Sequence, residues 1–304
     1  MSLFFNSNDD LRSGWRFALY VAVLLVTFVA LKYLLETSFQ NTLLPSITVL
    51  ALQILVLFVS AVVALLFMVR FVDHLPLSAF GIGLYERWPR DVFLGVVVST
   101  GMLAGLLMGG AVVGGVEIVW TVSEISLGAW TLTVAILLVS GAAEEMIFRG
   151  YPMQVLMKGI GIWPAMLVMS VLFGMLHTNN PDASRLSTAN TIVAGLMLSL
   201  AYLRTRSLLF PYGIHIAWNL GIGPIIGFPI SGVRFPSLWT ARMGGPAAIV
   251  GGVYGPEGGI LGTLIFFCGF LAVRTIVRVQ VSPRIRATIA QNAGKLYASD
   301  LKEL

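Results

Sequence analysis

Apolar stretches close to the length that a helix needs to cross the hydrocarbon core of a bilayer, about twenty residues, recur along this chain. They lie at residues 16–35, 47–70, 92–116, 129–150, 162–178, 188–203, 208–226 and 257–277. A helix satisfies its backbone hydrogen bonds within its own segment, as a membrane interior requires. The sequence therefore predicts an all-α, polytopic membrane protein with about eight transmembrane helices.

The composition supports this class and excludes several others. With 57% hydrophobic and 11% charged residues, the 304 residues carry too little polar surface to cover a soluble globule. The single cysteine, Cys268, excludes an internal disulfide, a cysteine-based zinc site and an iron–sulfur cluster. The excess of basic residues suits anionic lipid headgroups, so the lipid bilayer is an expected partner and a nucleic acid is not.

The distribution of lysine and arginine predicts the orientation. With the N-terminus inside, only four of the 19 basic residues fall on the outer side, namely Lys32, Arg185, Arg234 and Arg242. This positive-inside bias predicts that both termini are cytoplasmic. The expected location is the plasma (cell inner) membrane, as a multi-pass integral protein.

The same reading predicts the domain organisation. Residues 1–277 form a single transmembrane domain with a motif-bearing core at about 129–226, and residues 278–304 form a cytoplasmic C-terminal tail that we expect to be solvated. The glycine-rich stretch Gly244–Gly259 is too broken to span the membrane. It is expected to be a re-entrant or surface loop, and at membrane depth it must be covered by protein.

Three charged residues, Glu144, Glu145 and Arg149, lie at the end of an otherwise apolar stretch. Each costs roughly 2.5 to 3.5 kcal/mol at the centre of a membrane helix, so such residues usually face a cavity and have a function. Glu145 precedes Arg149 by four residues, the favourable order for an ion pair on one helix, which leaves Glu144 to face a cavity. The alternative is a structural ion pair, but such a pair needs only one glutamate.

Two further polar pairs occur in later apolar stretches. Phe173 and His177 are four residues apart and share a helix face, as do His215 and Asn219. Alone, His177 would be read as a histidine satisfied at a helix end, and His215 with Asn219 as an interhelical hydrogen bond worth about 1 kcal/mol or less. Their occurrence in spans that can pack against the glutamates favours a shared site.

The ordered set E-E-x-x-x-R, F-x-x-x-H and H-x-x-x-N resembles the type II CAAX prenyl endopeptidase family, also called the CPBP or Abi family. The resemblance covers roughly Gly141 to Gly221 and fills every motif position. It implies an intramembrane endopeptidase whose catalytic centre opens toward the cytoplasm. The implied substrate is a membrane-associated peptide or protein, and prenylated CAAX substrates are expected for eukaryotic relatives.

This chemistry assigns roles to five residues, and Arg149 completes the candidate site as a partner of Glu145. Amide hydrolysis needs an activated water, a stabilised oxyanion and a proton for the leaving amine. Glu144 is the expected general base, His177 orients the water, and Glu145 fixes His177 or Arg149. His215 and Asn219 are expected to donate hydrogen bonds to the oxyanion.

Zinc is the alternative means of activating the water. Glu144, His177 and His215 would be its ligands, because two histidines and a carboxylate are sufficient to hold a catalytic zinc. The chain lacks H-E-x-x-H, and the amide of Asn219 is a poor zinc ligand, so we favour a metal-free glutamate mechanism without a cofactor. A serine or cysteine nucleophile is disfavoured because no G-x-S-x-G motif is present.

The predicted topology contains one conflict, because Glu144 and His177 would lie at opposite membrane faces if every span were complete. Either the fourth helix continues past Arg149 toward Met157 with a kink at Pro152, or the fifth span is short or tilted. Two other functions use similar residues. A transporter or channel could use them as a proton relay, and a bacteriocin-immunity or scaffold protein could use the motifs for binding alone.

Overall fold

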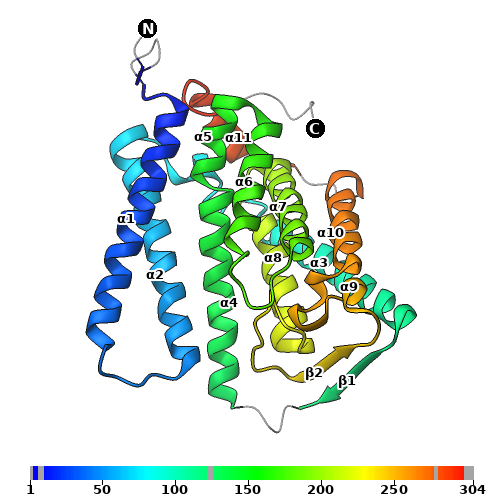
Figure 1. Ribbon diagram of the computed structural model, residues 1–304. Coiled ribbons are helices and arrows are strands. Elements are labelled where there is room, and N and C mark those ends of the chain that lie inside the picture. Colours follow the sequence, from blue (N-terminus) through cyan, green and yellow to red (C-terminus); the bar gives the residue numbers. More distant parts are fainter. Residues whose placement is uncertain (1–2, 6–9, 122–125, 277–279, 298–304) are drawn as a thin grey trace.

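The computed structural model describes residues 3–5, 10–121, 126–276 and 280–297, and this part of the chain is mostly helical (Figure 1). Its α-helices are α1 (Ser13–Phe39), α2 (Ser46–Phe67), α3 (Trp88–Val113), α4 (Leu127–Phe148), α5 (Tyr151–Ile160), α6 (Ile162–Leu176), α7 (Arg185–Thr205), α8 (Leu209–Leu220), α9 (Ala247–Val250), α10 (Ile260–Leu271) and α11 (Pro283–Gln291). Two strands, β1 (Val116–Trp120) and β2 (Trp239–Met243), pair antiparallel. The predicted helical class is confirmed, and the small sheet is an addition to it.

Within the described ranges, five helices are long and apolar enough to cross a membrane: Ser13–Phe39, Ser46–Asp73, Trp88–Val113, Leu127–Ile160 and Arg185–Thr205. Two of the other predicted spans, at Ile162–Leu176 and Ile260–Thr275, are shorter apolar helices. The stretch at 208–226 is α8 followed by a π-helical turn at Gly221–Ile226. The structure thus supports five candidate spans, and the predicted number of eight is not confirmed.

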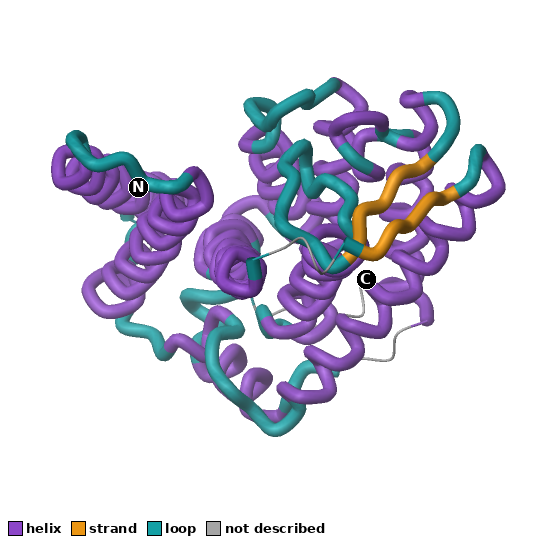
Figure 2. The backbone as a smooth tube through the Cα atoms, turned by 90° about the horizontal axis from the view of Figure 1, so that it is seen from below, coloured by secondary structure: helices purple, strands orange, loops and turns teal. Residues whose placement is uncertain are grey.

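The helices form a hairpin and a larger bundle. The hairpin of α1 and α2 packs on the bundle through α4 and α5, and it stands at one side in both views (Figures 1 and 2). The first and last described residues lie at the same end of the molecule as α5 and α11, which we call the terminal end. The two strands lie at the opposite end, which we call the sheet end (Figure 1).

Helices α3 and α8 cross in close contact, and this crossing places the third motif. A Cβ atom on Gly95 of α3 would lie 2.7 Å from the backbone N of Ile214, and one on Gly213 of α8 would lie 2.7 Å from the carbonyl O of Val92. Only glycine permits two helix backbones to approach this closely. His215 follows two residues after Gly213, so this contact fixes its position against α4.

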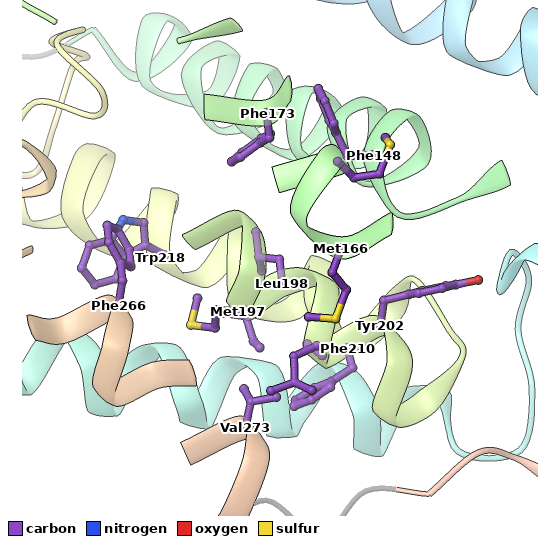
Figure 3. Packing of buried hydrophobic residues seen from close by; sticks show 14 of the residues in the cluster. Phe148, Met166, Phe173, Met197, Leu198, Tyr202, Phe210, Trp218, Phe266 and Val273 are labelled. Atoms are coloured by element: carbon purple, nitrogen blue, oxygen red, sulfur yellow. The ribbon is translucent and has the colours of Figure 1, made fainter. Parts of the chain in front are cut away.

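Buried apolar side chains from both halves of the sequence hold the bundle together. Figure 3 shows Met166 of α6, Met197 of α7 and Phe210 of α8 in one cluster with Phe148 of α4, from the first half of the sequence, and Phe266 of α10. In a bilayer, helix association depends on such close packing more than on a difference in hydrophobicity. The cluster therefore keeps α6, α7 and α8 in a fixed arrangement around the candidate site.

The break between α4 and α5 differs from the predicted kink. Helix α4 ends at Phe148, the backbone N–H groups of Arg149 and Gly150 both bond to the carbonyl of Glu145, and α5 begins at Tyr151. Pro152 lies in the first turn of α5, where its missing N–H is not needed. Helical structure continues past Arg149 to Ile160, as one of the two alternatives predicted, but the break lies at Arg149 and Gly150 rather than at Pro152. The other alternative is found as well, because α6 has only 15 residues.

The C-terminal segment folds back onto the terminal end. Ile285 and Ile289 of α11, together with Val281 and Leu296, are buried in the apolar cluster of α1 and α2. The prediction of a solvated tail is therefore wrong for the buried face of residues 281–296, whereas Arg284 and Arg286 are exposed; Arg278 and Lys302 lie outside the described residues. The nine-residue helix α11 carries two arginines among few large apolar residues, and it gave no sequence signal for this docking.

Polar contacts attach the same segment to α1. Arg16 is 3% exposed, and it donates to Asp73 Oδ2 at 2.7 Å, to the carbonyl O of Lys295 at 3.1 Å and to the hydroxyl of Tyr151 at 3.3 Å. The ammonium group of Lys295 in turn donates to the carbonyl O of Asp73 at 3.1 Å. These bonds link α1, α5 and the turn after α2 to the last described residues.

Candidate active site

A cavity of about 240 Å³ lies among α2, α4, α6, α7, α8 and the loops of the sheet end. Four of the six predicted site residues line it, namely Glu144, His177, His215 and Asn219. The other two, Glu145 and Arg149, are 1% and 0% exposed and lie behind the cavity wall. Three separate helices thus bring the six residues into one region. The remaining lining is mostly apolar.

The buried pair is joined to a third residue. Glu145 Oε1 accepts from the Arg149 guanidinium at 3.2 Å, which is the predicted ion pair, and it also lies 2.8 Å from His215 Nδ1. A second guanidinium nitrogen of Arg149 donates to the carbonyl O of Gly195 on α7 at 3.3 Å. Glu145 was expected to fix His177 or Arg149, and in the structure it fixes Arg149 and His215.

The partners of the two imidazoles determine their tautomers. An ionised Glu145 can only accept, so His215 Nδ1 carries a hydrogen and its Nε2 is turned to the cavity. His177 Nδ1 lies 2.8 Å from the carbonyl O of Phe173, so this nitrogen is also the donor. His177 Nε2 is therefore the lone-pair nitrogen of a neutral ring, suited to accept a hydrogen bond from water.

Glu144 is the charged residue most open to the cavity. Its side chain is 21% exposed, and Oε2 lies 3.7 Å from Nε2 of His215. Because Arg149 is paired with Glu145, the carboxylate of Glu144 is left facing His215 and the cavity. A carboxylate next to an imidazole at the edge of a small cavity is suited to exchange a proton with a bound molecule.

Phe173 lies at the centre of the site. Its ring centroid is 4.8 Å from that of His177 and 6.3 Å from that of His215, and the Arg149 guanidinium carbon lies 4.5 Å from it. One aromatic side chain therefore separates the two histidines and covers the arginine. The sequence spacing showed that Phe173 and His177 share a face, but it did not show these contacts to the other motifs.

Sequence reasoning missed three residues at the cavity: Trp218, Ser231 and Glu257. Ser231 and Glu257 follow the last motif in regions without helical periodicity. The only sequence signal was Glu257 itself, a carboxylate within the apolar, glycine-rich stretch Gly244–Gly259, which was predicted to need protein cover. In the structure Glu257 is 8% exposed and Tyr254 is 3% exposed, so that part of the stretch is covered.

The possible metal ligands at the cavity are the carboxylate of Glu144 and the imidazoles of His177 and His215. Among the described ranges, no group of three or more His, Cys, Asp and Glu side chains is arranged to hold a metal. The Nδ1 atoms of both histidines are engaged by Phe173 and Glu145, which leaves one nitrogen of each for the cavity. Each histidine thus keeps Nε2 as the nitrogen that could bind a metal, but the described side chains do not bring three such donor residues together.

The position of the cavity along the bundle differs from expectation. Asn180, Ser231 and Val233 at its margin belong to loops that follow the ends of α6 and α8 distant from the terminal end. The cavity therefore extends from Glu144 toward the sheet end. Both termini lie at the other end (Figure 1).

Comparison with known proteins agrees with the motif pattern. Residues 126–221 match the family model described as type II CAAX prenyl endopeptidase Rce1-like. This segment contains all six predicted site residues and confirms the resemblance. No curated protein matches the chain. Together with the apolar helices, the match supports an integral membrane peptidase of the CAAX protease type.

Proposed function

We propose, from the match to the type II CAAX prenyl endopeptidases, that this chain is an intramembrane endopeptidase that uses a glutamate-activated water without a metal. The observation that supports this most directly is the approach of Glu144 Oε2 to within 3.7 Å of His215 Nε2 at a cavity also lined by His177 and Asn219. A base, a water ligand and two oxyanion donors are thus available in one small volume.

The reaction needs one proton to move from water to the leaving amine. Glu144 removes a proton from a water whose other hydrogen bonds to His177 Nε2, and the oxygen attacks the substrate carbonyl carbon. The resulting oxyanion accepts hydrogen bonds from the amide of Asn219 and from Nε2–H of His215, which acts as the imidazolium with its Nδ1–H on Glu145. Glu144 then returns the proton to the amine nitrogen, and the carbon–nitrogen bond breaks. Arg149 and Glu145 hold His215 in place throughout.

The proposed substrate is a membrane-associated peptide or protein, and a prenylated chain is one form that the family suggests. The cavity walls are mostly apolar, so they suit a substrate segment that comes from the bilayer rather than from water. We place the protein in the plasma membrane as a multi-pass protein, with the shorter helices α6, α8 and α10 completing eight membrane-inserted helices.

Cleavage by the purified protein in lipid is expected to be unchanged after treatment with a zinc chelator. The reason is that Glu144 and the two histidines can activate water and stabilise the oxyanion without a metal. The measurement is the initial rate of cleavage of a fluorogenic membrane peptide, with and without chelator, in wild type and in His177→Ala. Complete loss of activity that added zinc restores would replace this scheme with the metalloprotease.

The proposed orientation has both termini in the cytoplasm, because the exposed basic residues Arg12, Arg90, Lys158, Arg284 and Arg286 belong to segments at the terminal end. The cavity extends toward the sheet end, so it would open to the side of the membrane away from the cytoplasm. The family resemblance implies the opposite opening. The two expectations cannot both hold for this chain.

Two single-cysteine variants in a Cys268→Ala background decide the orientation. An impermeant maleimide applied to intact cells is expected to label Arg242→Cys on β2 and to spare Gln291→Cys on α11, because the two exposed positions lie at opposite ends. After the membrane is opened, both are expected to react. Labelling of Gln291→Cys alone in intact cells would place the termini outside and the cavity toward the cytoplasm.

A further inference from the structure

A second carboxylate, Glu257, lines the cavity from outside the segment that matches the family. It lies in a short 3-10 turn, Pro256–Gly258, between α9 and α10, and it is 8% exposed. A buried carboxylate is stable only when donors satisfy its oxygens. The donors that do so here come from two different walls of the cavity.

Three hydrogen bonds satisfy Glu257. Its Oε1 accepts from the indole Nε1–H of Trp218 at 2.8 Å. Its Oε2 accepts from the backbone N–H of Ser231 at 2.6 Å and from the hydroxyl of Ser231 at 2.8 Å. Hydrogen bonds to an ionised carboxylate are shorter and stronger than those between neutral groups. We call this arrangement of Glu257, Trp218 and Ser231 the carboxylate clamp.

The carboxylate clamp joins α8 to the loop at the cavity margin. Trp218 directly precedes Asn219, the proposed oxyanion donor, and its ring packs on Phe266 with centroids 5.2 Å apart (Figure 3). Ser231 has a φ of 47°, a conformation uncommon for a residue other than glycine, and it lies in the turn closed by the bridge between Ile230 and Val233. The two hydrogen bonds to Ser231 hold this turn in place.

The turn that carries Glu257 is itself held in place. The amide nitrogen of Asn190 on α7 donates to the carbonyl O of Glu257 at 2.7 Å and to that of Gly259 at 2.9 Å. Gly255 has a φ of +98°, and a Cβ atom there would lie 2.4 Å from the carbonyl O of Pro229. The carboxylate is thus presented from a fixed backbone, and its own oxygens are occupied by protein donors rather than left for a substrate.

We propose that Glu257 is a positioning residue for the hydrolytic site, acting through Trp218 on Asn219 and through Ser231 on the cavity margin. This inference rests on the proposed function. Loss of the bond to Trp218 frees the last turn of α8, so the amide of Asn219 no longer meets the oxyanion at a fixed distance. Because the oxyanion exists only during the reaction, the loss falls on kcat rather than on KM.

The test uses the protein in lipid, four variants of the carboxylate clamp and one control variant. Trp218→Phe keeps the ring and removes the N–H donor, and Glu257→Met removes the acceptor. Each is expected to lower kcat by up to about 100-fold with little change in KM. The double variant should have the same kcat as the less active single variant, because both substitutions remove the same hydrogen bond. Glu257→Gln, whose amide oxygen can still accept from Trp218, should retain more activity. Glu117→Gln, an exposed carboxylate on β1, is the matched control and should match wild type.

A readout without activity separates this inference from the proposed function. The indole N–H signal of Trp218 in the NMR spectrum, identified by its loss in Trp218→Phe, should exchange slowly with solvent in wild type and faster in Glu257→Met. Wild-type kcat in both Trp218→Phe and Glu257→Met, with Glu144→Gln inactive, would overturn the positioning role alone. A wild-type protein that cleaves no peptide would overturn the proposed function, and the exchange rates would then still test the carboxylate clamp.

Discussion

Replacing Glu144 with glutamine is expected to lower kcat by about 100-fold to 10,000-fold, the contribution usual for a general base. Glutamine has nearly the same size and keeps a hydrogen-bonding side chain toward His215, but it cannot accept a proton from water. Substrate binding should remain, so KM should change little. The measurement is the steady-state rate of peptide cleavage by purified protein in lipid vesicles.

The control for this result is Glu86→Gln, which alters an exposed carboxylate outside the candidate site and should cleave at the wild-type rate. A Glu144→Gln protein as active as wild type would remove Glu144 from the mechanism. The same variant also separates hydrolysis from the alternatives. A scaffold or immunity protein would keep its binding phenotype in Glu144→Gln. An intramembrane proton relay would lose proton transport in this variant, and its wild type would cleave no peptide.

Replacing Arg149 with methionine is expected to destabilise the protein by about 3 to 5 kcal/mol, because it leaves the carboxylate of Glu145 buried without its cation. Both side chains of this pair are 1% exposed, so water cannot replace the lost partner. The guanidinium also binds the carbonyl O of Gly195 and lies over Phe173, and these contacts between α4, α7 and α6 are lost as well. Thermal unfolding in detergent micelles, followed by circular dichroism, measures the effect.

Arg70→Met is the matched comparison, since Arg70 is exposed in the turn after α2 and its replacement should leave the unfolding temperature nearly unchanged. The double variant Glu145→Met with Arg149→Met should be less destabilised than the sum of the two single variants, because the unpaired buried charge is removed. An unfolding temperature for Arg149→Met equal to that of wild type would show that the buried pair is not needed for the fold.

The sequence alone was sufficient where a contact depends on local spacing. The ion pair of Glu145 and Arg149 follows from their four-residue interval on one helix. Because Arg149 is then engaged by Glu145, the sequence also indicated that Glu144 faces a cavity. The bond from His215 to Glu145 joins residues 70 positions apart, and it depends on where α3 and α4 place α8. The periodicity of apolar residues does not show where α3 and α8 cross. The close approach of the two helices at Gly95 and Gly213 determines it.

Length limited the prediction of spans. The apolar content of α6 marks it as a candidate span, but its 15 residues are fewer than the about twenty that a helix needs to cross the hydrocarbon core. This shortness brings His177, at the C-terminal end of α6, to the same cavity as Glu144. The carboxylate clamp was missed for a different reason, because Trp218, Ser231 and Glu257 come from three segments that are joined only by tertiary contacts.

The docking of residues 281–296 onto α1 has a consequence for how the protein is made. Translation produces Arg16 long before Lys295, so the N-terminal hairpin must enter the bilayer while its final partners are still unsynthesised. The cluster of α1 and α2 is then completed only after residues 281–296 have been synthesised. A deletion of residues 281–296 therefore removes part of the packing of the N-terminal hairpin as well as the segment itself.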